Sequence, residues 1–551
     1  MVKELVTGEI LKNAFISGAN NIKKYKQAID ELNIFPVPDG DTGTNMNMTI
    51  SMAAKEVSFA DDNLGVDAIS KIFADALLRN ARGNSGVILS LIFRGFAKSF
   101  VGKNVATTLD MALALKSGVQ SAYDVVMKPT EGTMLTVIRK SAEYAVEVAE
   151  EVDKIDEFWE KVCIIAKETL ELTPTMLPVL EKAGVVDAGG KGLLVIFEGM
   201  QSVFKYNKII NKDCNEDEIA VNTQLNDVAE EEIKFSYCTE FIICKSNKAL
   251  EVTSLRAYLE SVGDCVVVVD DEDIIKIHIH TNEPGEVITR AIKYGQLTNI
   301  KIDNMKKQCE GKNKPEEAEG NKKLKYIPVD ENLEYGFVAV VAGDGLCKLF
   351  KDLGVNSIVS GGQTMNPSTD DILNAIHATP AKTVFVLPNN KNIIMAAEQA
   401  VNMADRKVCV LQSRTIPQGL AAMLAFAMNN SFEENRMEMT KAIDNVSTGQ
   451  ITFAAKDSDF DGHKIKRGDI LGLANGKLCF TDKDLNKACL KLIKNMLKKD
   501  SSFVTVIYGR DVKDEQISEL DEIIKSKIGN NVEVNIIYGG QPVYYYIISV
   551  E

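Results

Sequence analysis

Hydrophobic residues recur at three- and four-residue spacing through the first 206 residues, which is the period of an amphipathic α-helix. Ile10, Phe15 and Ile22 begin this pattern and predict a helix over residues 9–32. The same period predicts further helices, one opening near Met46 and the others over residues 66–80, 86–101, 105–127, 134–152, 156–171 and 191–206. Because only short turns separate these segments, we predict a helical bundle of about eight helices.

From residue 231 the hydrophobic period changes to two, which is typical of β-strands. The predicted strands cover residues 235–244, 265–269 and 273–280. Residues 250–262 and 284–295 keep a helical period, so this region is predicted to be a small α+β domain.

After residue 325 short apolar strands alternate with helical stretches. The predicted strands are residues 336–342, 357–359, 383–387 and 408–411. This alternation predicts a parallel sheet with ligand-facing loops at the strand ends. We expect the last 50 residues to add a second α/β or α+β layer, ending in the strand 543–550.

Two polar stretches divide the chain. Residues 207–230 are acidic with no clear period, and residues 305–325 carry mixed charge with few apolar side chains, so both are predicted linkers. The predicted fold is therefore multidomain: all-α over residues 1–206, α+β over 231–304 and α/β over 326–551.

The composition narrows the class of protein. A net charge of -15 and a pI near 5.1 argue against a nucleic-acid binder and against a protein of anionic membrane surfaces. The ten cysteines form no Cys-x-x-Cys pair, so neither a disulfide framework nor a zinc ribbon is indicated. We see no signal peptide and no apolar run of membrane length, and we expect a cytoplasmic protein.

The candidate chemistry centres on the stretch from Asn33 to Met46. Asp39 and Asp41 flank a glycine, an arrangement whose oxygen donors suit a hard cation such as Mg²⁺. The following residues open a predicted helix, and a helix N-terminus favours bound phosphate. A calcium-like structural turn or an N-capped loop is the open alternative.

Three more predicted helices begin at similar turns, over residues 82–86, 129–133 and 187–192. Each turn carries glycine together with a hydroxyl, amide or carboxylate that could simply cap the helix. Four such turns in one bundle favour a nucleotide site. The chain has neither the Gly-x-x-x-x-Gly-Lys-[Ser/Thr] motif nor the protein-kinase motifs, so any ATP would be held on a different scaffold.

In sequence and order these turns resemble the nucleotide-binding (DhaL-like) domain of the dihydroxyacetone kinases. Over essentially the whole chain, the resemblance is to the family of the ATP-binding subunit of bacterial fatty acid kinase. It implies a helical barrel that holds ATP through a pair of Mg²⁺ ions, with Asp39 and Asp41 as metal ligands and catalytic residues. The residues implied at the nucleotide are Thr44, Asn45, Asn84, Ser85, Gly86, Thr133, Met134, Asp187 and Gly189.

One position departs from the dihydroxyacetone kinase pattern, which has a third aspartate upstream of the pair. Here the nearest candidate is Asn33, which is neutral and a weaker ligand for Mg²⁺.

The middle domain holds a second candidate metal site. His278 and His280 alternate with isoleucines in one predicted strand, so the two imidazoles share a face, and Cys238 would complete three zinc ligands with one open position. Two solvated surface histidines are the open alternative. The resemblance favours zinc, because the middle domain of the fatty acid kinase family carries a cysteine and a His-x-His at matching positions.

The C-terminal domain resembles the DegV-type fold, which this family uses to dock a separate fatty-acid-carrying protein. Its loop over residues 361–368 has the composition of an anion site but lacks basic residues, so a tight structural turn is equally open.

The activity that the resemblance implies is ATP-dependent phosphorylation of the carboxylate of a fatty acid presented by a DegV-type partner. The product would be an acyl phosphate for phospholipid synthesis. The rivals are a dihydroxyacetone-type kinase and a non-catalytic ATP-binding scaffold. The linkers and the C-terminal module also predict a homodimer or partner complex.

Overall fold

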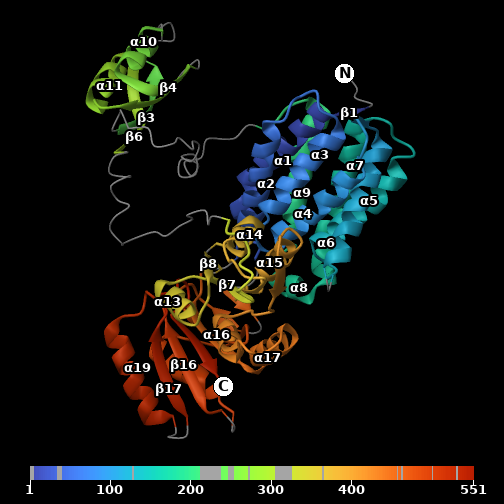
Figure 1. Ribbon diagram of the computed structural model, residues 1–551. Coiled ribbons are helices and arrows are strands. Elements are labelled where there is room, and N and C mark those ends of the chain that lie inside the picture. The colour runs from blue at the N-terminus through green and yellow to red at the C-terminus, as the bar shows by residue number, and fades with distance from the viewer. Residues whose placement is uncertain are drawn as a thin grey trace. The chain divides into compact units, whose positions relative to one another are not determined.

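The computed structural model describes residues 5–33, 40–126, 129–210, 237–245, 253–270, 274–304, 326–362, 365–455, 457–460, 463–498, 501–528 and 532–551 (Figure 1). The chain divides into two compact units. One comprises Met1–Asp213 together with Asn321–Glu551, and the other is Cys214–Gly320. The domain boundaries given above stay predictions.

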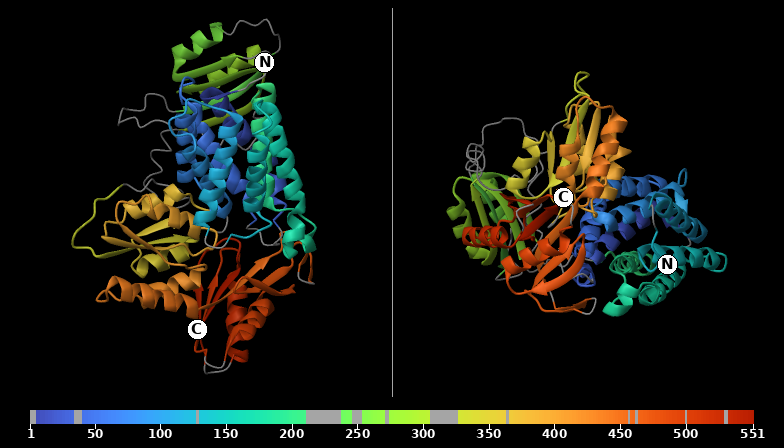
Figure 2. Two further views of the ribbon diagram at one scale, coloured as in Figure 1. Left: turned by 90° about the vertical axis from the view of Figure 1, so that its right-hand side faces the viewer. Right: turned by 90° about the horizontal axis from the view of Figure 1, so that it is seen from below.

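The described residues up to Tyr206 form a bundle of helices, as the hydrophobic period predicts, and Figures 1 and 2 show these helices side by side. The helices are α1 (Gly8–Asp30), α2 (Thr42–Ser58), α3 (Val66–Arg79), α4 (Gly83–Lys98), α5 (Thr108–Val125), α6 (Met134–Val148), α7 (Ile155–Met176), α8 (Pro178–Ala183) and α9 (Ala188–Tyr206). Strands β1 (Val6–Thr7) and β2 (Val105–Ala106) pair antiparallel at one end. We call α1 to α9 the helical domain.

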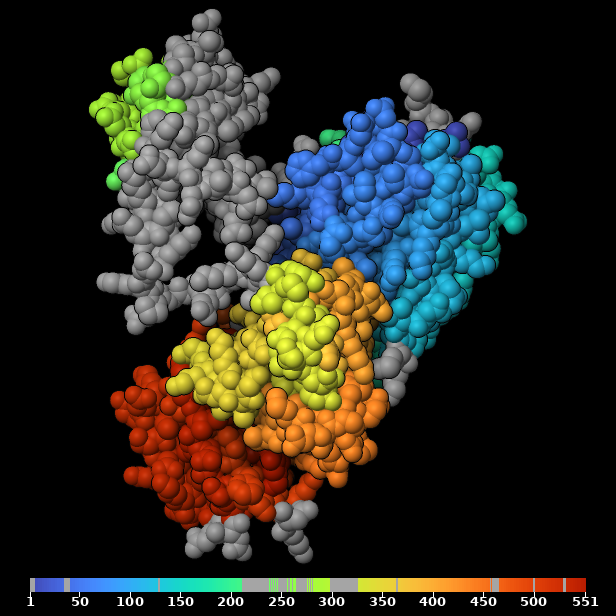
Figure 3. Space-filling model, viewed as in Figure 1, coloured from blue at the N-terminus to red at the C-terminus, as the bar shows by residue number. Residues whose placement is uncertain are grey.

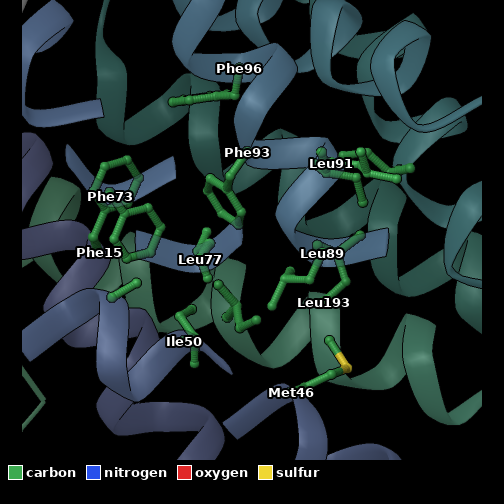
Figure 4. Close-up of a cluster of buried hydrophobic side chains, with 14 of the residues drawn as sticks. Phe15, Met46, Ile50, Phe73, Leu77, Leu89, Leu91, Phe93, Phe96 and Leu193 are labelled. Atoms are coloured by element: carbon green, nitrogen blue, oxygen red, sulfur yellow. The ribbon is translucent and has the colours of Figure 1, made fainter. Parts of the chain in front are cut away.

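Aromatic side chains fill the centre of the helical domain (Figure 4). Phe15 stacks on Phe73 with ring centroids 4.0 Å apart, and Phe93 meets both rings edge-on. Trp159, the only tryptophan of the chain, is fully buried, and its indole N–H donates to the carbonyl of Phe197 at 3.0 Å. Tryptophan fluorescence therefore reports on the folding of the helical domain alone.

The second unit is an antiparallel sheet with helices, in agreement with the predicted α+β class. Its strands follow the order β4-β5-β3-β6. Its elements are β3 (Tyr237–Lys245), α10 (Thr253–Val262), β4 (Gly263–Asp270), β5 (Ile274–Thr281), α11 (Pro284–Ala291), the 3-10 helix η2 (Ile292–Tyr294) and β6 (Gly295–Asn304). Ile275, Ile277 and Ile279 share the buried face of β5, as the alternation predicts.

The predicted parallel sheet is present, with strand order β10-β9-β7-β8. Its elements are β7 (Tyr335–Val341), α13 (Asp344–Asp352), β8 (Ser357–Ser360), α14 (Thr369–His377), β9 (Thr383–Leu387), α15 (Ile394–Val401) and β10 (Lys407–Val410). Helices α16 (Ile416–Ala425) and α17 (Phe432–Asn445) follow.

A second, mixed sheet of order β15-β14-β11-β18-β16-β17 completes the C-terminal part. It begins well before the last 50 residues. Its elements, with the separate hairpin β12-β13, are β11 (Ser447–Phe453), β12 (Ser458–Phe460), β13 (His463–Ile465), β14 (Ile470–Ala474), β15 (Lys477–Asp482), α18 (Leu485–Met496), β16 (Phe503–Tyr508), α19 (Asp514–Lys527), β17 (Glu533–Tyr538) and β18 (Tyr546–Val550). We call β7 to β18 the C-terminal domain.

The parallel sheet and the helical domain share one buried apolar cluster. Helix α14 contacts α3, and α15 contacts α4. Figure 3 shows the yellow and orange surface of the C-terminal domain directly against the blue helices. No helix within the described ranges is long and apolar enough to cross a membrane.

Candidate functional site

The stretch that carries Asp39 and Asp41, which we call the acidic turn, leads directly into α2. Asp41 occupies the N-cap position, yet its side chain caps no N–H of this helix within the described residues. Asp30, at the end of α1, takes that role: its carboxylate accepts from the backbone N–H of Thr44 at 3.1 Å and from the Thr44 hydroxyl at 2.7 Å. Asp30 was not among the site residues predicted from the sequence. The available signal was a carboxylate in the last turn of a helix, where the helix dipole disfavours negative charge.

Asn33 holds the two ends of the acidic turn together. Its amide donates to the Asp30 carbonyl at 3.0 Å, and its amide oxygen accepts from the Thr42 hydroxyl at 2.9 Å. A Cβ at Gly40 would lie 2.8 Å from the Asn33 Cβ, so only glycine fits there. Asn33 thus links the residues on either side of this turn by hydrogen bonds. Its role as a metal ligand stays a prediction. Asp39 lies outside the described residues.

The turn before α4 packs against the start of α2. Gly83 has φ +58°, and a Cβ there would lie 2.6 Å from Nδ2 of Asn45, which is 4% exposed. The Thr49 hydroxyl donates to the Asn45 carbonyl at 2.7 Å and accepts from the backbone N–H of Arg82 at 3.1 Å. These contacts place the first two predicted turns side by side.

The side-chain oxygen of Asn84 points to a bound ligand. This oxygen is buried and has no hydrogen-bond partner among the described residues. Leaving such an acceptor unpaired costs about 1–3 kcal/mol. A ligand hydroxyl, an N–H group or a metal-bound water would satisfy it. Ser85 and Gly86 follow in the first turn of α4, where backbone N–H groups favour an anion.

The turns before α6 and α9 meet at Asp187. Its carboxylate accepts from the backbone N–H of Gly190 at 2.7 Å, and the N–H groups of Met134 and Gly189 also donate to it. Met134 packs on Gly189, where a Cβ would lie 3.0 Å from the methionine Cε. Asp187 therefore ties together the starts of two helices.

Two further contacts complete the arrangement. Thr133 caps α6, its hydroxyl accepting from the Leu135 N–H at 3.4 Å. A Cβ at Gly192, in the first turns of α9, would lie 2.6 Å from Sδ of Met46 in α2. The four predicted turns thus form one connected group, in which α4 contacts α2, α2 contacts α9 and α9 contacts α6.

Burial raises the pKa of Asp187 to about 6, against the opposing effect of its three backbone donors. An unfolded aspartate has a pKa of about 3.9, so the stabilisation that protonated Asp187 gives to the folded state is present below about pH 4 and is lost as pH rises through about 6. We expect the unfolding free energy of the wild type, relative to Asp187→Asn, to fall by roughly 3 kcal/mol between pH 4 and 7. Urea unfolding followed by Trp159 fluorescence measures this difference, and a value independent of pH would contradict it.

The C-terminal domain also reaches the acidic turn. Nδ2 of Asn366, in the loop between β8 and α14, donates to Oδ2 of Asp41 at 2.8 Å. From the sequence, the 361–368 loop could be either an anion site or a structural turn. Within the described part of this loop, Asn366 is a contact between domains that neither alternative included.

In the middle unit, backbone pairing brings the candidate zinc residues together in register. Cys238 pairs with His280 across β3 and β5, and Glu240 pairs with His278. Positions 238, 278 and 280 therefore lie on one face of the sheet. Their side chains lie outside those that the structure describes. Among the side chains that it does describe, no group of three His, Cys, Asp or Glu forms a metal site.

Comparison with known protein families covers most of the chain. Residues 36–202 match the DAK2 domain, residues 234–312 the FakA-like middle domain of fatty acid kinase, and residues 336–551 the FakA-like C-terminal domain of fatty acid kinase.

Curated relatives match from end to end. Protein YloV of Bacillus subtilis is 40% identical over 99% of both chains, and the uncharacterized protein SAB1090 of Staphylococcus aureus is 37% identical over 99% of both. A solved structure titled as fatty acid binding of a DegV family protein from Thermus thermophilus is 14% identical, covering 39% of this chain and 99% of that one. Its TM-score of 0.31 is too low to establish a shared fold. On its full-length relatives and its three family matches, the chain belongs to the FakA-like family of fatty acid kinase proteins, with a dihydroxyacetone-kinase-type N-terminal domain.

Proposed function

We propose that this chain is an ATP-dependent phosphotransferase that phosphorylates the carboxylate of a fatty acid carried by a separate DegV-type protein. The observation that carries the proposal is the joining of four glycine-containing helix starts, the first of which follows Asp41, in a chain of the FakA-like family. Helix starts present N–H groups and positive partial charge, which suit the phosphates of ATP.

Each part of the site has a task in this reaction. The first turn of α4, with Asn84, Ser85 and Gly86, would hold the phosphates through N–H and hydroxyl groups. The starts of α6 and α9, with Thr133, Met134 and Gly189, would line the nucleotide. Asp187 would fix both starts in place, because it already binds their N–H groups.

The carboxylate chemistry of the acidic turn fits Mg²⁺. The Asp41 side chain is not used as a helix cap, and Asp39, two residues earlier in the sequence, supplies the same kind of oxygen donor. Two bound Mg²⁺ ions would neutralise the charge of the β- and γ-phosphates during transfer. Asp30 would keep the start of α2 in place by holding Thr44.

The transfer itself needs no protein base. A fatty acid carboxylate is already ionised near pH 7. One of its oxygens bonds to the γ-phosphorus while the bond from that phosphorus to the bridging oxygen breaks, so ADP leaves and an acyl phosphate forms. All four histidines of the chain lie beyond residue 270, which accords with such a mechanism in the helical domain.

The remaining proposals concern assembly and place. The C-terminal domain would dock the fatty-acid carrier, the chain would act as a homodimer in the cytoplasm, and its product would enter phospholipid synthesis. The docking role and the use of the product are implied by the family resemblance, whereas the homodimer and the cytoplasmic location come from the sequence. The carrier-dependent assay below tests whether the carrier is required.

We also propose that Cys238, His278 and His280 bind Zn²⁺, since backbone register places these positions on one face of the sheet. The purified chain should contain about one zinc per molecule, and Cys238→Ser should lose most of it. Cys479→Ser, at an exposed cysteine of the C-terminal domain, is the control. Elemental analysis that finds no zinc in the wild type would refute the site.

The test of the function is ATP consumption by the purified chain with Mg²⁺, alone and with a fatty-acid-loaded DegV-type protein. Turnover that needs the loaded carrier supports the proposal. Turnover on dihydroxyacetone instead would move the chain to the rival kinase class, and no turnover with either acceptor would favour an ATP-binding scaffold.

A further inference from the structure

The side chain of Asn366, in the C-terminal domain, contacts the carboxylate of Asp41, which we propose as a Mg²⁺ ligand of the helical domain. Its side chain is 3% exposed, and Nδ2 lies 2.8 Å from Oδ2 of Asp41 across a separation of 325 residues. The same nitrogen lies 3.3 Å from the position of a Cβ on Gly83. Asn366 therefore sits between the acidic turn and the turn before α4.

The segment of residues 366–371, which contains Asn366, contacts the helical domain largely through its backbone. The Arg82 guanidinium donates to the Asn366 carbonyl at 2.7 Å and lies 3.5 Å from Oδ2 of Asp371. Arg82 and Ser368 form an antiparallel backbone bridge, and the Thr369 N–H donates to the Ala81 carbonyl at 3.1 Å. The segment is thus paired, like an added strand, with the residues that lead into Gly83 and Asn84.

Contacts within the C-terminal domain fix the same segment at both of its ends. Ser368 and Asp371 form a capping box at the start of α14. The Gly362 N–H donates to the Met365 carbonyl at 2.9 Å, and the Asn390 amide donates to the Gly362 carbonyl. Because both ends of the segment are fixed, the Asn366 amide has a defined direction toward Asp41.

We propose that Asn366 is a positioning residue for Asp41, supplied by the C-terminal domain to the nucleotide site of the helical domain. By donating to Oδ2, the amide fixes the orientation in which the Asp41 carboxylate would meet the cation. Hydrogen bonds of this kind around metal ligands fix ligand orientation. The inference rests on the proposed function only in taking Asp41 as a Mg²⁺ ligand.

A consequence is that the two domains are coupled at this site. The C-terminal domain must be docked on the helical domain for Asn366 to reach Asp41. Formation of the metal site and docking of the domain therefore stabilise one another, since each favours the same arrangement.

The test measures ADP binding to the full chain by calorimetry as a function of Mg²⁺ concentration, without fatty acid or carrier. Asn366→Asp keeps the shape but places a second carboxylate against Asp41, and Asn366→Ala removes the donor. We expect both to raise the half-saturating Mg²⁺ concentration about tenfold or more. Saturating Mg²⁺ should restore ADP binding to Asn366→Ala, which a misfolded protein would not allow.

Asn374→Ala is the matched control, because this asparagine lies on α14 and its amide donates to Asp370 of the same helix at 3.3 Å. It should leave the Mg²⁺ dependence unchanged. Trp159 fluorescence checks that each variant keeps the helical domain folded.

An unchanged Mg²⁺ dependence in both Asn366 variants would overturn the proposal. Tighter Mg²⁺ binding in Asn366→Ala would also overturn it, because the amide would then block the metal. Since no acceptor is present, failure of phosphotransfer to a fatty acid leaves this result unaffected.

Discussion

Asp41→Asn should lower the rate of phosphotransfer by orders of magnitude while leaving the helical domain folded. The substitution removes a negative charge from the acidic turn but keeps an oxygen that can accept from Asn366. Loss of a metal-binding carboxylate removes several kcal/mol of transition-state stabilisation, so we expect a rate loss on the order of 10³-fold. Initial rates of acyl phosphate formation measure the loss, and the thermal midpoint from Trp159 fluorescence should not fall.

The matched control is Asp75→Asn, at an exposed carboxylate on α3 of the same domain. It removes the same charge from the helical domain at a residue that is not part of the candidate site, so its rate should match that of the wild type. If Asp41→Asn kept its activity within about tenfold, Asp41 would not be the central metal ligand.

Gly83→Ala should weaken nucleotide binding strongly. Alanine in the left-handed region costs roughly 1–2 kcal/mol. Here the new methyl would also lie 2.6 Å from Nδ2 of Asn45 and 3.3 Å from Nδ2 of Asn366. Displacing packed groups costs about 1–3 kcal/mol, so ADP affinity should fall on the order of 10- to 100-fold, measured by calorimetry with Mg²⁺.

Gly102→Ala separates the backbone effect from the steric one. Gly102 also has a positive φ, +77°, but a Cβ there would meet nothing within 4 Å. It should lose stability by about 1–2 kcal/mol and bind ADP as the wild type does. Equal affinities for the two variants would show that the space around Gly83 is not part of a nucleotide site.

The helical domain and the parallel sheet could be predicted because their signals are local. Hydrophobic period marks each long helix, and each strand from β7 to β10 is an apolar run followed by a turn. Helix α8 was not predicted, because its six residues are too few to show a helical hydrophobic period. Strands β12 and β13 have three residues each, and β11 is defined by pairing with β18 about a hundred positions later.

In the candidate site, too, the local features could be predicted and the long-range contacts could not. Its four turns are visible in the sequence because glycine and capping residues recur at helix starts. Asp30 acts on Thr44 across 14 positions, and Asn366 acts on Asp41 across 325. Contacts at such separations depend on how helices and domains pack, which hydrophobic period does not encode.

The family resemblance and the structure suggest different roles for Asn33. By resemblance it is the nearest candidate for a third metal-binding aspartate of the dihydroxyacetone kinase pattern, one residue further from the pair, whereas in the structure its amide ties Asp30 to Thr42. An amide donates and accepts at once, which a carboxylate does not. Holding the turn closed is therefore a sufficient reason for asparagine at this position.

The most direct measurement follows the γ-phosphate of ATP to its acceptor. The purified chain would be incubated with labelled ATP, Mg²⁺ and a fatty-acid-loaded DegV-type protein, and any acyl phosphate trapped with hydroxylamine as the hydroxamate. We predict hydroxamate formation that requires the loaded carrier and is lost in Asp41→Asn. ATP-dependent labelling of dihydroxyacetone without hydroxamate, or no transfer at all by a chain that binds ADP, would contradict the proposed function.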